Sequence, residues 1–359
     1  MSEVTNSIYK TGTVDLFEAA DPFSVGYVNS EEYLQIKSRV DTHVLAGVQF
    51  GCERDLVFED DNTIRQIAIP SVESQRTIAL WLSSKPVTYQ NSGLLSLASN
   101  GQVLVGHISC DYYRGGIEEN THRCYRELLE QTTAAGYPYL LRLWNYIPDI
   151  NSDDNGLESY QRFTLGRYRA FKNVYKNVSE NLPAATAVGI TDENLLVGFI
   201  AGKRPGVFLE NPRQVSAYHY PKKYGPRSPS FARATYQRWG QKEILFISGT
   251  ASIFGHESQH PGDVRRQLQE TFKNIESVIE HAINQRHLHA AGGLHDLTGV
   301  KVFLRNLTDY ELIRPLLEKH LNSGIDLMVL QADICRIELM VEVEAMVNVN
   351  LDDIRVVPG

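Results

Sequence analysis

Cysteine is scarce in this chain: the 359 residues contain four, and no two of them form a Cys-x-x-Cys pair. Scattered thiols argue against a disulfide framework and against a thiolate zinc site. Long apolar runs are also missing, since none approaches the roughly 18 residues of a membrane span. The N-terminal residues have no basic region followed by an apolar one, so we expect no signal peptide. These absences predict a cytoplasmic protein that does not enter a membrane.

Positive charge is in short supply as well, because 35 Lys and Arg stand against 43 Asp and Glu, a net charge of −8. An acidic chain is a poor candidate for nucleic-acid binding. Residues 203–238 are the exception, with three Lys and five Arg against one acid, so they carry +7 while the rest of the chain sums to −15. Prolines stiffen this basic segment and tyrosines are interleaved with its charges. Such a segment indicates a site for a small polyanion.

The C-terminal half shows the element order β-α-β-α-β-β. Its first helix is expected over 263–286, because apolar residues recur there at spacings of three and four. A capping box, Thr308-x-x-Glu311, is expected to open the second helix. Alternating or continuous apolar residues predict strands at 243–252, 300–304, 325–330 and 338–347.

The preceding region repeats this order about 160 residues earlier. Strands are expected at 102–109, 139–144, 185–190 and 195–201, and helices at 117–135 and 157–175. We therefore predict an α+β fold of two duplicated modules, residues 1–204 and residues 205–359, the second carrying the basic segment. Residues 1–40 are interpreted as an arm or extra layer of the first module. Two unrelated α+β domains are the alternative, because βα patterns are common.

Two histidine-rich segments invite a metal interpretation, and we reject both. Residues 256–260 match the zinc-protease pattern H-E-x-x-H, which needs both histidines on one helical face. Pro261 disfavours helical backbone at the second histidine, so a polar loop is the better interpretation. His287, His289 and His295 lie in a glycine-rich connection and are interpreted as solvated. We expect neither a metal nor another cofactor.

Four segments of the C-terminal half resemble the RidA/YjgF family, whose fold is also called chorismate-mutase-like. They read ILFISGTAS, RQLQETFKNIESVIEHA, AAGGLHDLTGVKVFLRNLTDYE and ELMVEVEAMV. Domains of this family usually form trimers with ligand sites between subunits. A chain with two such modules could build the equivalent cleft within itself, so a monomer is expected and a trimer is the alternative.

Further segments are similar to the chorismatase family over most of the chain. They are NPRQVSAYHYPKKYGPRSPSFARA, SGTASIFGHESQHPGD and the stretch from Cys335-Arg336 to Glu342. The resemblance implies that chorismate is the substrate. It also implies that the products are pyruvate and either a dihydroxycyclohexadiene acid or a hydroxybenzoate.

Chorismate carries two carboxylates, which call for cationic side chains, and the guanidinium of arginine matches a carboxylate in shape. The resemblance favours tyrosines and arginines of the basic segment and of the helix expected at 157–175, while the strand end near residue 250 offers backbone N–H groups and a hydroxyl. The substrate contacts that we expect are Tyr160, Arg167, Arg213, Tyr220, Arg233, Gly249, Thr250 and Ala251.

Cleavage of the enol ether requires an acid that keeps its proton near neutral pH. The resemblance assigns this role to Glu342, which lies in an otherwise apolar strand where burial can raise a carboxyl pKa. Glu338 and Glu344 share its face by period two and stay open as alternatives. Cys335 is expected either to assist the later opening of the arene-oxide-like ring intermediate or to shape the pocket.

The resemblance also bears on the product, since hydroxybenzoate-forming members carry Gly249 and Cys335 at the matching positions. We therefore expect an enzyme that makes 3-hydroxybenzoate. The 4-hydroxy isomer and the hydrolytic product remain alternatives. A non-catalytic protein that binds an anionic metabolite and an imine deaminase of the RidA type are the other hypotheses.

Overall fold

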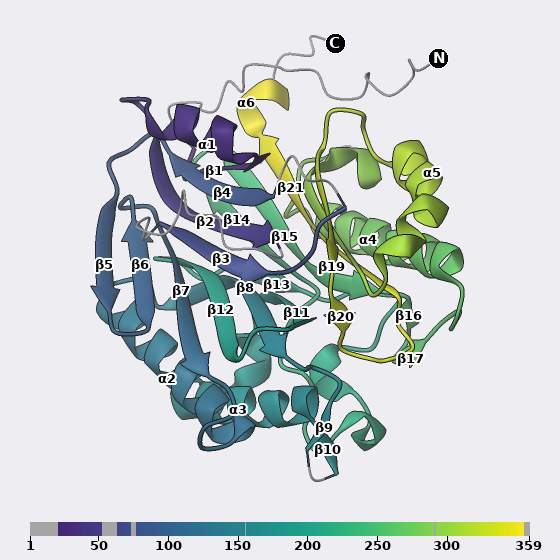
Figure 1. Cartoon of the computed structure of the whole chain (residues 1–359). Coiled ribbons are helices and arrows are strands. Elements are labelled where there is room, and N and C mark those ends of the chain that lie inside the picture. Colours follow the sequence, from purple (N-terminus) through teal and green to yellow (C-terminus); the bar gives the residue numbers. More distant parts are fainter. Residues whose placement is uncertain (1–20, 52–62, 73–76, 155, 291, 355–359) are drawn as a thin grey trace.

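The computed structural model describes residues 21–51, 63–72, 77–154, 156–290 and 292–354. Three sheets meet in the interior, and helices cover the outer faces of the two larger ones (Figure 1). At the lower edge of the view lie α2 (Ile117–Ala134) and α3 (Ser159–Val174), and at the right lie α4 (Val264–Asn284) and α5 (Tyr310–His320). The chain is thus a mixed α and β protein.

The first large sheet has seven strands in the order β20-β11-β8-β12-β7-β6-β5. It is built almost entirely from the N-terminal half, and α2 packs on β7. Its strands are β5 (Thr88–Ser92), β6 (Leu95–Ser99), β7 (Val103–Asp111), β8 (Tyr139–Pro148), β11 (Ala184–Ile190), β12 (Asn194–Gly202) and β20 (Asp333–Ile334).

The second large sheet has six strands in the order β13-β14-β15-β21-β18-β19. The long amphipathic helix α4 packs on β15 and β21, and Asp263 caps it by accepting from the Arg266 backbone N–H. The strands are β13 (Val207–Leu209), β14 (Ala234–Trp239), β15 (Lys242–Ala251), β18 (Leu297–Leu304), β19 (Asp326–Gln331) and β21 (Val341–Asn350).

The two large sheets share one internal order. The run β6-β7-β12-β8-β11 in the first corresponds, strand by strand, to β14-β15-β21-β18-β19 in the second. In both, the last strand of the unit lies between the two strands that the first helix of the unit joins, which are β7 and β8 in the first unit and β15 and β18 in the second. One strand crosses between the units: β20 comes from the C-terminal half but pairs with β11, with Val188 opposite Ile334.

A third sheet, which the sequence patterns did not predict, precedes the two units. It has the order β1-β4-β2-β3 and extends well past the arm expected at residues 1–40, of which residues 1–20 lie outside the described part. Its elements are β1 (Ser24–Val28), α1 (Ser30–Lys37), β2 (His43–Gly51), β3 (Ile64–Ala68) and β4 (Ile78–Ser83). The shorter elements of the chain are β9 (Asp153–Asp154), β10 (Leu157–Glu158), β16 (Ile253–Phe254), β17 (Glu257–Ser258) and α6 (Leu351–Ile354).

The central core lies where the three sheets meet. Trp81 of the third sheet packs against Trp144 of the first, with ring centroids 5.1 Å apart, and Phe303 of the second sheet joins the same cluster. Strand β18 is therefore buried on both faces, because Val302 points to the helices while Phe303 points to this central layer. The sequence pattern predicted one buried face for this strand, and the second face is covered only through tertiary packing.

Two local predictions were wrong. The helix α5 begins at Tyr310 after a 3-10 turn at Leu307–Asp309, and Thr308 makes no capping-box hydrogen bond. The last strand begins at Val341, so Glu338 lies in the loop before it and does not share its face. The prediction that residues 256–260 form no helix is confirmed, since they contain a turn and one strand of a short hairpin.

Candidate active site

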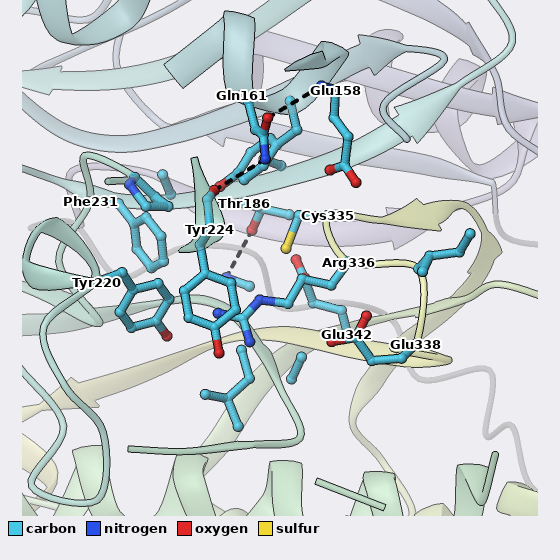
Figure 2. Close-up of a pocket in the computed structure, with 18 of the residues that line it drawn as sticks. Glu158, Gln161, Thr186, Tyr220, Tyr224, Phe231, Cys335, Arg336, Glu338 and Glu342 are labelled. Atoms are coloured by element: carbon cyan, nitrogen blue, oxygen red, sulfur yellow. Dashed lines mark hydrogen bonds between the residues drawn. The ribbon is translucent and has the colours of Figure 1, made fainter. Parts of the chain in front are cut away.

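A cavity of about 240 Å³ opens between the two large sheets (Figure 2). Side chains from both units and from the basic segment line it, which places its walls on α3, β11, β15, β21 and the loop before β21. The lining residues are Glu158, Tyr160, Gln161, Arg167, Ala185, Thr186, Ala187, Tyr220, Lys223, Tyr224, Pro229, Phe231, Arg233, Gly249, Ala251, Ile253, Cys335, Arg336, Ile337, Glu338 and Glu342.

Glu342 stands on β21 and presents its carboxyl to the cavity wall, with only 4% of the residue exposed. Burial raises the pKa of this carboxyl to about 8, and the charge of Glu344 acts in the same direction, while Arg142 and Arg233 oppose it. No hydrogen bond to the carboxyl is found within the part of the chain that the structure describes. At neutral pH the Glu342 side chain is therefore a carboxylic acid with its proton available.

Glu344, two residues on, is buried just as deeply but is held as a carboxylate. Arg142 approaches it at 2.8 Å and Lys301 at 2.9 Å, and it also accepts from Trp144 Nε1 and Thr186 Oγ1. Burial alone would raise its pKa, but Lys301 and Arg142 lower it below the ordinary value. Its lone pairs are committed to these donors, so it is no candidate for the proton donor.

Glu338, the third acid considered, stands in the loop before β21. It lines the cavity, is half-buried and accepts a hydrogen bond from Ser258 Oγ at 2.6 Å. Among the three acids, only Glu342 combines deep burial with a pKa raised toward neutrality.

Gly249 leaves the space that the Glu342 carboxyl occupies. A Cβ at this position would overlap Glu342 Oε1 and would lie 2.9 Å from its Cδ and 3.2 Å from Thr186 Cγ2. The ladder between β15 and β21 is irregular between Ile247 and Thr250, which turns the Gly249 N–H toward Thr186 Oγ1 at 3.1 Å. Only glycine fits this close approach without displacing the carboxyl.

Two buried arginines present unused donors at the cavity. Arg167 is 1% exposed, and its Nε and Nη1 have no hydrogen-bond partner among the described residues. Arg233 donates through Nη2 to Tyr220 Oη at 2.8 Å and to the Val215 carbonyl at 3.0 Å, while its Nε is also without a partner there. A buried donor without a partner is costly, and an anionic ligand would satisfy these groups.

Cys335 and Tyr160 line the cavity together with Glu342, and both are close enough to feel its charge. Burial raises the pKa of the Cys335 thiol to about 12, and the nearby Glu342 adds to this effect. Burial also raises the pKa of Tyr160 well above its usual range. Both side chains thus keep their protons at neutral pH and are hydrogen-bond donors toward the cavity.

The structure brings eight of the ten residues expected from the sequence to this cavity, and two lie elsewhere. Arg213 is engaged by an ion pair with Glu270 and donates through Nε to Asn274 Oδ1 at 2.9 Å. Thr250 donates its hydroxyl to the Ser248 carbonyl at 2.7 Å and does not line the cavity. Neither residue is retained as a substrate contact.

Several lining residues escaped the sequence analysis, and Arg336 is the most prominent of them. Its guanidinium lies over the Tyr224 ring, 3.9 Å from the centroid, as Figure 2 shows. It also donates to the His256 carbonyl and to Ser258 Oγ, both at 3.0 Å. For both residues the sequence held a signal that could have been used. Arg336 directly follows Cys335, and Tyr224 belongs to the basic segment with its interleaved tyrosines. Thr186, in a plain apolar strand, had none.

Neither a metal centre nor a membrane segment is found in the described ranges. No three His, Cys, Asp or Glu side chains gather there in a way that could hold a metal ion. None of the helices in those ranges is both long and apolar enough to cross a membrane.

Comparison with known proteins identifies the family. Residues 79–201 match the family model described as "Chorismatase FkbO/Hyg5-like, N-terminal". A 3-hydroxybenzoate synthase of Streptomyces hygroscopicus is 39% identical over 240 residues, which are 65% of this chain and 70% of the relative. The chain belongs to the chorismatase family. The resemblance noted in its sequence is thereby confirmed.

Further members of the chorismatase family agree in sequence and in fold. A chorismatase of Streptomyces hygroscopicus is 34% identical over 277 residues, 75% of this chain and 78% of the relative. The crystal structure of a chorismatase superposes with a TM-score of 0.77 at 30% identity, and the match covers 85% of this chain and 92% of that one. The mixed α and β architecture is thus that of a solved chorismatase.

Proposed function

We propose that this member of the chorismatase family converts chorismate into 3-hydroxybenzoate and pyruvate without a cofactor. The observation that carries the proposal is the buried Glu342 acid, whose pKa is raised to about 8, in a cavity where Arg167 and Arg233 present unpaired donors. A dianion with a protonatable enol ether matches both features. The name of the 3-hydroxybenzoate synthase among the relatives supports the choice of product.

Binding begins with the two carboxylates of chorismate. Arg167 and Arg233 offer N–H groups that the protein leaves unsatisfied, and each charge-assisted hydrogen bond contributes about 1.5–3 kcal/mol. Arg336, stacked on Tyr224, adds a third positive charge to the wall. Tyr160 and Tyr220 supply apolar faces with hydroxyl donors between these cations. Because the enolpyruvyl methylene must reach Glu342, the position of that acid limits which arginine can bind which carboxylate.

Cleavage starts when the Glu342 carboxyl gives its proton to the methylene, which becomes the methyl group of pyruvate. The oxygen of the ring C4 hydroxyl then attacks C3 as the C3–O bond breaks, and its proton passes to the Glu342 carboxylate. Pyruvate leaves with the ether oxygen as its keto oxygen. The remaining arene oxide opens at C4–O as its oxygen takes the proton of Glu342, and the hydrogen of C3 then leaves as a proton to the Glu342 carboxylate. This gives the aromatic 3-hydroxybenzoate and restores the acid. The atoms of the two products equal those of chorismate, so no water is consumed.

Cys335 and Gly249 act on the second half of this sequence. The Cys335 thiol keeps its proton, so it can donate a hydrogen bond to the oxygen of the opening arene oxide. Gly249 leaves room for Glu342 to stay close to the ring throughout. We also propose that residues 1–204 and 205–359 are two RidA/YjgF-like modules, and that their junction forms one complete site within a single chain.

The test is a chorismate incubation with the purified protein after exhaustive dialysis against a chelator. Pyruvate and 3-hydroxybenzoate should form in equal amounts, measured by a coupled dehydrogenase assay and by chromatography. In water enriched in oxygen-18 the aromatic product should carry no label. A dihydroxycyclohexadiene acid in place of the aromatic acid would indicate the hydrolytic reaction. Binding of chorismate without any pyruvate release would refute an enzymatic function.

A further inference from the structure

Behind the cavity lies a buried ionic cluster that the proposed reaction does not use. Glu344 is bound by Arg142 and Lys301, and Trp144 and Thr186 donate to the same carboxylate. The cluster joins β21 to β8, β18 and β11, so it lies at the centre of the molecule. Replacing a buried ion pair by apolar residues is often neutral or stabilising, so stability is a weak reason for keeping these charges.

The charged and titratable groups around Glu342 come from every element packed against it. They are Glu344 on its own strand, Arg142 on β8, Arg233 before β14, Tyr160 on α3 and Cys335 in the loop before β21. Two of these groups are cations that favour the ionised form of Glu342. Glu344 is the anion that offsets them, because the hydroxyl of Tyr160 and the thiol of Cys335 keep their protons.

We propose that Glu344 is a positioning residue for the reaction: a permanent carboxylate, fixed by Lys301 and Arg142, that keeps the proton on Glu342 between turnovers. The inference rests on the proposed role of Glu342 as the acid. It adds that the protonation state of this acid is set by a second carboxylate, outside the cavity, that never touches substrate.

Thr186, on β11, links Glu344 to the backbone beside Glu342. Its hydroxyl donates to Glu344 Oε2 at 2.6 Å, and its oxygen accepts from Arg142 Nη2 at 2.5 Å and from the Gly249 N–H at 3.1 Å. Gly249 is also the residue whose missing side chain makes room for Glu342. The same hydroxyl therefore connects the anion, its counter-ion and the backbone beside the acid.

Lys301 is held away from water by an aromatic cage. Its ammonium lies 2.9 Å from Glu344 Oε1, and only 2% of the residue is exposed. Four ring centroids lie between 5.6 and 5.8 Å from Nζ, those of Tyr27, Phe50, Trp81 and Trp144. Such a cage stabilises a cation through the faces of the rings, so the partner of Glu344 stays charged and in place. Three of the rings belong to the third sheet, which thereby contributes to the site without lining it.

The test compares Glu344→Gln with Glu344→Asp, which keeps the charge. The protonated Glu342 carboxyl is followed by infrared difference spectroscopy against Glu342→Gln over a range of pH. In the wild type the band should persist to about pH 8. In Glu344→Gln it should be lost about one pH unit lower, since Arg142 then acts unopposed, and turnover at pH 9 should fall about tenfold. In Glu344→Asp, the pH at which the band is lost and the turnover at pH 9 should both be close to those of the wild type.

Loss of one buried partner can also prevent folding, because it leaves Arg142 and Lys301 without an anion. The double variant Glu344→Gln/Lys301→Gln removes one charge of each sign and serves as the folded alternative. It should show the same downward shift of the Glu342 band. An unshifted band in Glu344→Gln or in the double variant would overturn the inference. A shifted band in a protein that does not convert chorismate would show that Glu344 sets the protonation state of Glu342, and it would refute the proposed function instead.

Discussion

The carboxyl of Glu342 combines two properties that are rarely found together, deep burial and an unsatisfied hydrogen-bonding capacity facing a cavity. Burial raises its pKa to about 8, so the proton is present at neutral pH and is still acidic enough to be transferred. Its neighbour Glu344, in the same strand and equally buried, has its pKa lowered by two cations. The two side chains are chemically identical, and their different surroundings make Glu342 an acid and Glu344 a fixed anion.

Glu342→Gln should abolish turnover while leaving chorismate binding intact. The amide keeps the shape of the side chain but has no transferable acidic proton, and general acid catalysis contributes about 10²–10⁴-fold. Pyruvate release and chorismate-dependent thermal stabilisation, measured on the same sample, check this expectation. Retained turnover would contradict it and would move the acid to Glu338.

Glu342→Gln should also stabilise the folded protein relative to the wild type, and this difference should grow as the pH rises. The Glu342 carboxyl has a folded-state pKa of about 8 against an ordinary value of 4.5, so folding favours its protonated form. In the unfolded chain this carboxyl ionises near pH 4.5, while the folded protein keeps it protonated, so the free energy of unfolding of the wild type falls progressively between about pH 4.5 and pH 8. Glu342→Gln escapes this loss, which is on the order of 4 kcal/mol at pH 8. Urea unfolding at pH 5 and pH 8 measures it, and an equal difference at both pH values would contradict the prediction.

Gly249→Ala should impair the chemical step more than binding. The added Cβ would overlap Glu342 Oε1, so the carboxyl must move away from the substrate. A displacement of about 1 Å typically costs about 100-fold in rate. Steady-state kinetics should show a fall in kcat with little change in KM. Gly324→Ala is the matched control, because a Cβ there meets no atom within 4 Å.

At the scale of elements, the loop between β20 and β21 carries Cys335, Arg336 and Glu338 into the cavity. Arg305, just after β18, holds this loop, and every nitrogen of its guanidinium is engaged. The acceptors are Leu339 O, Asn151 Oδ1, Asp333 Oδ1, Ile334 O and Arg336 O. The loop is thus fixed to the second unit through β18 and to the first unit through Asn151.

Arg305→Lys should loosen this loop without unfolding the protein. Lysine lacks the planar fork and cannot reach all five acceptors at once. Because Cys335 and Arg336 would then be less well positioned, kcat should fall and KM should rise, together lowering kcat/KM by about tenfold to 100-fold. Hydrogen exchange of residues 333–339 should increase in parallel. Arg314→Lys, on the exposed face of α5, is the control and should change neither quantity.

The sequence predicted the elements of the two units that share one strand order well, because each has a strong local pattern. The helix α4 repeats apolar residues at spacings of three and four, and α2 ends before the expected Gly136. The third sheet was missed, since its strands are stabilised by packing on the other sheets. The second buried face of β18 was missed for the same reason.

Residues of the site could be predicted where the residue type itself indicates a chemical role, as for an arginine or for a glutamate in an apolar strand. Residues whose role depends on partners from distant elements could not. Arg167, Arg233 and Glu342 had such signals and line one cavity. Arg213 had the same signal, but Glu270 on α4 pairs with it, which charge counting along the chain cannot reveal. The role proposed here for Glu344 depends on partners from β8 and β18 and was beyond the sequence.

For the whole molecule, the site exists only where the two units meet. Tyr160 and Arg167 come from the first unit, while Glu342 and Cys335 come from the second. Strand β20 also lies in the sheet of the first unit, beside β11. Neither half can therefore complete the cavity by itself.

Separate production of residues 1–204 and 205–359 should yield no activity and poorly soluble pieces. Without β20, the edge of β11 is unpaired, and exposed strand edges promote aggregation. Size-exclusion chromatography and the pyruvate assay on each piece test this. A soluble, folded first piece would contradict the expectation.

The last strand of the chain, β21, lies in the middle of its sheet, between β15 and β18. In the chain, β21 comes after every other strand of this sheet, so during synthesis the sheet stays open at its centre until β21 has been made. Cys335 and Glu342 arrive in the same final stretch. Closure of this sheet and completion of the cavity lining therefore depend on the same stretch of chain, residues 335–350.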